Sequence, residues 1–103
     1  MPTVTPAMSP IVTLYGRPDC SLCDEARATL DGLRRERLGN GLPGFDVVER
    51  DIGTDPELEA RFRSVIPVVE VGGRRLELAV SIGRLRRLLA EGLGDPTSPL
   101  APR

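Results

Sequence analysis

The sequence predicts one α/β domain with the element order β-α-β-α-β-β-α and a four-stranded mixed sheet that carries helices on both faces. The first half of the chain reads as strand, long amphipathic helix and strand, a unit that requires parallel strands joined by a crossover helix. In the second half, Gly72-Gly73 separates two short apolar runs, which indicates a hairpin of antiparallel strands. The 103 residues suit one domain with one modest core.

The two ends of the chain are expected to lie outside this domain. Residues 1–10 contain three prolines and little to bury, which predicts a mobile leader, and residues 92–103 predict a mobile tail. The domain is therefore expected over 11–91. The first ten residues lack the basic start and apolar middle of a secretory signal, and no apolar run approaches the ~20 residues that span a bilayer. We therefore expect a cytoplasmic protein without a membrane partner.

The first strand and the first helix are the clearest elements. Residues 11–15 are nearly all apolar or β-branched, as in a strand buried on both faces. A helix is predicted from Cys20 to Leu38, with Gly39 as its end. Its apolar stripe is expected to consist of Leu22, Ala26, Leu30 and Leu33.

The next two elements are predicted to be a strand over 45–50 and a short helix. Thr54 is expected to cap this helix, with Pro56 in its first turn. Its apolar face is expected to contain Leu58, Phe62 and Val65.

The last three elements follow the same logic. Strands are predicted over 68–71 and 74–78, with Leu76 and Leu78 facing the core. Ser81 is expected to cap a final helix. The buried stripe of that helix is expected to consist of Ile82, Leu85, Leu88 and Leu89.

Cys20 and Cys23 are the only cysteines, and they lie where the first strand gives way to the first helix. The sequence has no histidine, so a Cys/His zinc site is excluded, and two thiols alone cannot complete a tetrahedral zinc site. We therefore expect no metal. A helix N-terminus favours a thiolate over a thiol, which predicts a redox-active pair. The competing interpretation is two reduced thiols that pack as small apolar groups.

Charged residues around the cysteines act in opposite directions. Arg17 can stabilise a thiolate, while Asp19 and Asp24 are like charges beside it and oppose its formation. Arg17 is equally well interpreted as a solvated loop arginine, because exposed charge pairs contribute little.

Several motifs resemble the glutaredoxins, and in particular a glutaredoxin-like branch with the motif Cys-Ser-Leu-Cys-Asp-Glu-Ala. The resemblance covers about 11–91, and it implies the thioredoxin-like fold. The matching stretches are Leu14 to Cys23, Cys20 to Ala26, Asp51-Ile52, Asp55 to Leu58, Ile66-Pro67-Val68 and Gly72-Gly73.

The resemblance also implies roles for individual residues. Cys20 is implied to be the attacking nucleophile and Cys23 the resolving thiol. Pro67 is implied to follow a cis bond, which leaves the backbone of Ile66 to pair with the bound partner. Arg17 is implied to receive a carboxylate of glutathione.

The expected function is that of a thiol–disulfide oxidoreductase that acts on protein or low-molecular-weight disulfides and is recycled by a thiol or a reductase. No cofactor is expected. Glutathione is left open as a co-substrate, because residues 78–82 replace the Gly-Gly pair and acid that glutaredoxins place before the last helix. The alternatives are a non-enzymatic redox sensor or adaptor, and an iron–sulfur cluster held by Cys20 from two copies.

The remaining charges give two further expectations. The net charge is −1 and the arginines are scattered along the sequence, which predicts no nucleic-acid partner. We also expect a monomer. Glu70 interrupts an apolar strand, so we expect it to face solvent at the strand end or to pair with Arg74 or Arg75. A role for Glu70 as proton acceptor for Cys23 is the less favoured alternative.

Overall fold

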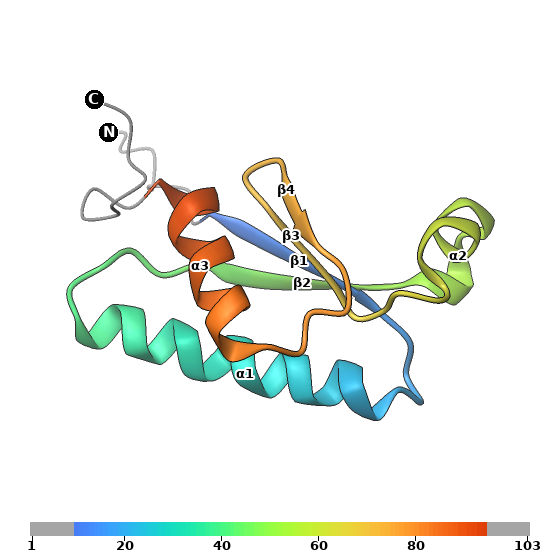
Figure 1. The fold of residues 1–103 in the computed structure, drawn as a ribbon, viewed down its shortest axis with the longest axis horizontal. Helices are drawn as coiled ribbons and strands as arrows, with labels where there is room; N and C mark the ends of the chain where they lie inside the picture. Colours follow the sequence, from blue (N-terminus) through green and yellow to red (C-terminus); the bar gives the residue numbers. More distant parts are fainter. Residues whose placement is uncertain (1–9, 95–103) are drawn as a thin grey trace, which may run out of the picture.

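The computed structural model describes residues 10–94 and has the predicted order of elements (Figure 1). The predictions of a leader and a tail concern residues 1–9 and 95–103 for the most part, and these residues lie outside the described part. The elements are β1 (Ile11–Gly16), α1 (Ser21–Gly39), β2 (Asp46–Asp51), the 3-10 helix η1 (Ile52–Thr54), α2 (Pro56–Phe62), β3 (Val68–Val71), β4 (Arg74–Leu76) and α3 (Ile82–Leu93).

The sheet is mixed, as predicted, with the strand order β2-β1-β3-β4. β1 and β2 are parallel, while β3 is antiparallel to both β1 and β4. Gly72 and Gly73 form the predicted hairpin turn, and both have positive φ, 58° and 80°. This arrangement leaves β2 and β4 as the two edge strands.

Alternate residues of the central strands serve two separate cores. Leu14 and Val69 lie in the core under α1 and α3, and these helices lie together on one side of the sheet in Figure 1. Tyr15 and Val68, one position away along each strand, pack instead with residues of α2 and η1. Because successive side chains of a strand point to opposite faces, helices cover both faces, as predicted.

The buried stripe of α1 begins one residue later than predicted. Leu22 is 43% exposed, whereas Cys23 is 1% exposed. The buried positions are Cys23, Ala26, Leu30, Leu33 and Arg37, which follow the helical period. The thiol, and not the more hydrophobic leucine beside it, therefore faces the sheet.

Asp55, and not Thr54, caps α2. The Asp55 carboxylate accepts the backbone N–H groups of Glu57 and Leu58, at 2.9 and 3.4 Å. Thr54 ends η1, where its hydroxyl donates to the carbonyl of Asp51 at 2.8 Å. The short 3-10 helix uses Thr54, so the cap moves to the next residue.

Two further hydrophobic positions are exposed, against prediction. β4 ends at Leu76, after which Leu78 has a φ of 50° and is 53% exposed. Here the chain leaves the sheet and forms hydrogen bonds with the segment before β3. The Leu78 and Ala79 N–H groups donate to the carbonyls of Val65 and Pro67. Ile82, at the first turn of α3, is 54% exposed.

The start of α3 agrees with the prediction, whereas its end lies further along the chain than predicted. Ser81 caps α3 as predicted, because its hydroxyl accepts the N–H of Arg84 at 3.2 Å. The helix continues to Leu93, so it extends into the segment assigned to the tail. Within residues 10–94, no helix is both long enough and apolar enough to cross a membrane.

Candidate functional site

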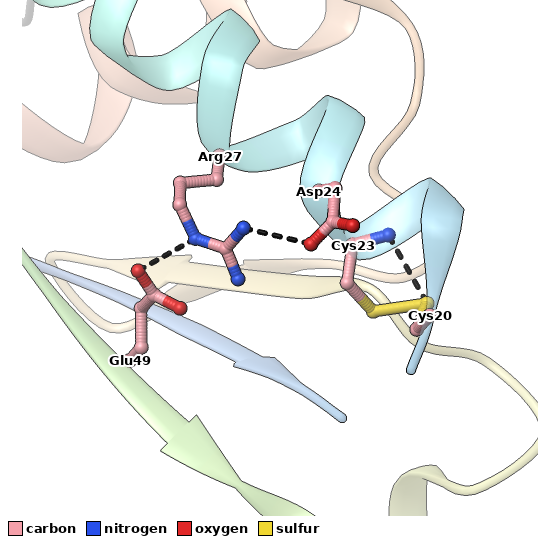
Figure 2. Close-up of polar contacts among 5 residues, drawn as sticks. All are labelled: Cys20, Cys23, Asp24, Arg27 and Glu49. Carbon is pink, nitrogen blue, oxygen red and sulfur yellow. Dashed lines mark hydrogen bonds and ion pairs between the residues drawn. A yellow bond between two sulfur atoms is a disulfide. The ribbon is translucent and has the colours of Figure 1, made fainter. Parts of the chain in front are cut away.

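Cys20 is the residue that caps the N-terminus of α1. Its backbone is extended, with φ −111° and ψ 109°, and its Sγ accepts the N–H of Cys23 at 3.1 Å (Figure 2). A helix start leaves several N–H groups without intrahelical partners, and one of them here points at sulfur. The predicted position of this thiol at the helix start is confirmed, and that position stabilises negative charge on sulfur.

The two cysteines form a disulfide and differ in exposure. Their Cα atoms are 5.2 Å apart, and Figure 2 shows the bond between the two sulfur atoms. Cys20 is half-buried, whereas Cys23 lies one turn into α1 and is buried. One sulfur is thus placed where a partner can reach it, and the other where only Cys20 is a ready target.

Gly16, at the end of β1, is a site residue that the sequence did not single out. A Cβ at this position would lie 2.7 Å from Cys23 Sγ and 3.1 Å from Cys23 Cβ. Only glycine lets the strand approach Cys23 this closely without displacing it. The available signal in the sequence is a glycine directly after the apolar residues 11–15, four positions before Cys20.

An ion-pair network flanks Cys23 on the β2 side. Arg27 Nη1 donates to the Asp24 carboxylate at 2.8 Å, and its Nε donates to Glu49 at 2.7 Å (Figure 2). These hydrogen bonds raise the pKa of Arg27, and the bond to Glu49 has a larger effect than the bond to Asp24. Asp24 therefore opposes a Cys20 thiolate less than the sequence suggested, because its charge is shared with Arg27.

A cavity of about 320 Å³ lies next to Cys23, between α1 and the ends of β1 and β2. Its walls contain both polar and apolar groups, and it joins Arg17 and Cys23 to the network around Arg27. It is lined by Leu14, Gly16, Arg17, Pro18, Cys23, Arg27, Glu49, Arg50 and Asp51.

Arg17 makes an ion pair with Glu59 of α2, and its side chain is 37% exposed. The Arg17 side chain is therefore only partly exposed to solvent, and its guanidinium already has a carboxylate partner outside the cysteine pair. The pair connects the loop before Cys20 to α2, and a ligand carboxylate at Arg17 has to compete with Glu59.

Ile66 and Pro67 lie directly before β3, and the bond between them is cis. Pro67 is buried and Ile66 is half-buried. The last ladder pair of β1 and β3 is Tyr15 with Val68, so the next residues along the two strands are Gly16 and Pro67. This register brings Pro67 to the same end of the sheet as Gly16 and, through it, Cys23.

Glu70 has a partner that the sequence did not predict. The Tyr15 hydroxyl donates to the Glu70 carboxylate at 3.0 Å, and Glu70 makes no ion pair with Arg74 or Arg75 within residues 10–94. Burial, followed by this hydrogen bond, raises the pKa of Tyr15. The two side chains reach each other diagonally across β1 and β3, a relation that depends on strand register.

Clusters of three or more metal-ligating side chains are not found among residues 10–94. The described site thus consists of the cysteine pair, Gly16, Arg17, the Arg27 network and the Ile66–Pro67 segment.

Comparisons with known proteins agree with this fold. A family model described as a glutaredoxin-like domain (DUF836) matches residues 11–90. A comparison with curated proteins gives no significant match. Among solved structures, the chain is similar to a mutant of the thioredoxin-like protein BC3987, with a TM-score of 0.52 and 22% identity. That match covers 76% of this chain and 97% of the other, and it shows the fold. The chain therefore belongs to the glutaredoxin-like domain family and has the thioredoxin-like fold that its sequence predicts.

Proposed function

We propose that this protein is a thiol–disulfide oxidoreductase that cycles between a Cys20–Cys23 dithiol and a disulfide. The observation that carries the proposal is the asymmetry of the pair at the start of α1. Cys20 is half-buried and accepts a backbone N–H on its sulfur, while Cys23 is buried and within bonding reach of Cys20. An attacking thiol needs access and charge stabilisation, whereas a resolving thiol needs only proximity to the first.

The reaction proceeds by two exchanges. The Cys20 thiolate attacks a substrate disulfide, one substrate sulfur bonds to Cys20, and the other leaves as a thiolate that takes up a proton. The deprotonated Cys23 then attacks Cys20 Sγ and releases the second substrate thiol. The substrate disulfide is reduced by two electrons, and the dithiol is oxidised by two. An external thiol or a reductase restores the dithiol.

Arg17, Ile66 and Pro67 are proposed to bind the substrate. Pro67 lies directly before β3, at the position next to Gly16 of β1, so the segment lies at the cysteine end of the sheet. Arg17 lines the same cavity as Cys23 and offers a guanidinium to a substrate carboxylate, in exchange for Glu59. Protein disulfides and low-molecular-weight disulfides are the proposed substrates, glutathione remains a candidate co-substrate, and the cytoplasm is the proposed location.

Trapping of the mixed disulfide tests this proposal. Cys23→Ser, incubated with oxidised glutathione or with insulin, is expected to form a stable adduct on Cys20 that mass spectrometry detects. Cys20→Ser is the matched control and is expected to form none, because the remaining thiol is buried. Adducts on neither variant, or adducts only on Cys23, contradict the proposed roles.

The same trapping in cell extract separates the alternatives. Capture of many proteins by Cys23→Ser supports an oxidoreductase, whereas one dominant captured protein supports a redox sensor. A brown preparation that contains iron supports cluster binding through Cys20 instead.

A further inference from the structure

A second concave surface lies at the β4 edge of the sheet, where α3 packs against β3 and β4. It has a volume of about 410 Å³ and shares no lining residue with the cavity next to Cys23. We call it the β4–α3 groove. It is lined by Arg74, Arg75, Leu76, Arg84, Arg87, Leu88 and Glu91.

The groove concentrates positive charge in a protein whose net charge is −1. Arg74 shares its charge with Glu91 at 3.4 Å. Arg84 and Arg87 are exposed, and in the part of the chain that the structure describes neither has a carboxylate within ion-pair distance. The i,i+3 spacing of these two arginines places both on one face of α3.

The other arginines nearby are already engaged elsewhere. Arg75 is among the lining residues of the groove, but its guanidinium lies 5.5 Å from the centre of the Phe62 ring, so its charge is directed to the opposite face of the sheet. Arg86 bonds Glu36 of α1 through two nitrogens, at 2.9 and 3.0 Å. Arg84 and Arg87 are thus the guanidinium groups of this region that the fold itself does not use.

Charged residues on an edge strand often serve only to prevent pairing with another chain. That explanation fits Arg74 and Arg75, which lie on β4. It does not apply to Arg84 and Arg87, which lie on α3 across the groove. Leu76 and Leu88 supply the apolar part of the groove lining.

We propose that the β4–α3 groove binds an extended acidic segment of a partner protein, which adds as a strand beside β4. Carboxylates at alternate positions of the segment face the groove and pair with Arg84 and Arg87, and the methylene groups of the same side chains pack on Leu76 and Leu88. Glu91 in the groove wall disfavours a ligand that is anionic along its whole length, such as a polyphosphate. The inference is independent of the cysteines and goes beyond the proposed redox function.

A designed peptide tests the groove. A fluorescent peptide that alternates glutamate and valine is titrated with the full-length protein, and binding is followed by anisotropy. The double variant Arg84→Gln/Arg87→Gln is expected to weaken binding by roughly tenfold or more, because it removes both charge-assisted hydrogen bonds. Added salt is expected to weaken binding to the wild type more than to this variant. Amide shifts in the NMR spectrum are expected over β4 and α3.

Matched controls make the result specific. Arg35→Gln/Arg63→Gln removes the same charge from exposed positions outside the groove and is expected to bind as the wild type does. Cys20→Ser/Cys23→Ser is also expected to bind normally, which separates this proposal from the redox proposal. A peptide with N-methylated backbone amides is expected to lose binding, because it cannot add to an edge strand.

Several outcomes overturn the proposal. Equal binding of the glutamate peptide by wild type and Arg84→Gln/Arg87→Gln removes the role of the arginines. Equal affinity for a glutamine–valine peptide removes the role of charge, and undiminished binding of the N-methylated peptide removes strand addition. Tighter binding of triphosphate or of a single-stranded oligonucleotide, lost in the double variant, assigns the groove to a different ligand class.

Discussion

At the scale of single residues, Gly16 shows how an absent side chain positions a reactive one. Cys23 occupies the space that a Cβ of residue 16 would need. The thiol of Cys23 is therefore held against β1 by close packing. Its position next to Cys20 depends on β1 as much as on α1.

The substitution Gly16→Ala tests this packing. We expect it to lower the free energy of unfolding by about 1–3 kcal/mol, because the added methyl group has to displace Cys23 or the strand. Urea unfolding at fixed redox state measures the effect. Gly32→Ala is the matched control, since a Cβ there meets nothing within 4 Å, and in the middle of α1 it is expected to stabilise by ~0.5–1 kcal/mol. Equal effects at the two positions contradict the packing argument.

Tyr15 and Glu70 give a second prediction at this scale, with a defined pH dependence. Burial and the hydrogen bond to Glu70 raise the pKa of Tyr15 above its ordinary value of 10.0. The neutral hydroxyl is the form that donates to Glu70, so its stabilisation is complete below about pH 10 and is lost as pH rises through the folded pKa.

Ultraviolet absorbance of tyrosinate measures this directly, because Tyr15 is the only tyrosine and the chain has no tryptophan. The midpoint in the folded protein is expected above that of the protein unfolded in urea. Glu70→Gln is expected to lower it, since the negative charge that opposes ionisation is removed. A folded midpoint at or below the unfolded one is inconsistent with the hydrogen bond.

At the scale of elements, the start of α2 shows that a sequence can contain more candidate capping residues than the helix uses. Three successive residues, Thr54, Asp55 and Pro56, all suit a helix start. The structure uses Asp55 as the cap of α2 and Pro56 as its first residue, while Thr54 closes η1. α2 is only seven residues long, so its cap carries a large share of its local stability.

Asp55→Ala is expected to destabilise the protein by ~1 kcal/mol, because two N–H groups of α2 lose their acceptor. Asp55→Asn keeps an acceptor oxygen and is expected to recover most of this loss. Thermal unfolding of both variants followed by circular dichroism is the measurement. If the asparagine variant is as unstable as the alanine variant, the lost stability comes from another interaction of Asp55, such as the weak ion pair with Arg50 at 3.9 Å.

At the scale of the whole molecule, the hairpin turn and the end of α3 are packed directly against each other. A Cβ at Gly72 would collide with the carbonyl oxygen of Gly92, and a Cβ at Gly92 would lie 2.7 Å from Val71. Gly72 therefore has two reasons to be glycine, its positive φ and this contact, whereas Gly73 has only the first. The contact connects the β3–β4 hairpin to the last helix.

Comparison of Gly72→Ala with Gly73→Ala isolates the contact. In both variants the alanine has to adopt a left-handed backbone conformation, which lowers the free energy of unfolding by ~1–2 kcal/mol in each. Gly72→Ala is expected to lower the free energy of unfolding by roughly 1–3 kcal/mol more, because the methyl group meets backbone that cannot move aside alone. Urea unfolding gives the difference, and hydrogen exchange in the last turn of α3 locates it. Similar losses in the two variants argue against the contact.

Prediction from the sequence succeeded where the responsible interactions are local. The order of elements, the glycine hairpin and the Ser81 cap follow from residues within a few positions of each other. It failed at Leu22, Ile82 and Leu78, because hydrophobic residues near element ends obey the same period whether or not a partner element lies opposite them. Exposure at those positions depends on where the sheet and the loops end.

By itself, therefore, the sequence determined the fold class, the pairing of two thiols at a helix start, and the absence of histidine near them. The tertiary structure alone decided which residues surround those thiols and which charges meet. Glu49 reaches Arg27 through strand register, Tyr15 reaches Glu70 across the sheet, and Gly16 abuts Cys23. The arginines of β4 and α3 are scattered in the sequence but line one groove. The physical reason is that spacing along a chain specifies neighbours within one element, while contacts between elements depend on how the whole sheet and its helices pack.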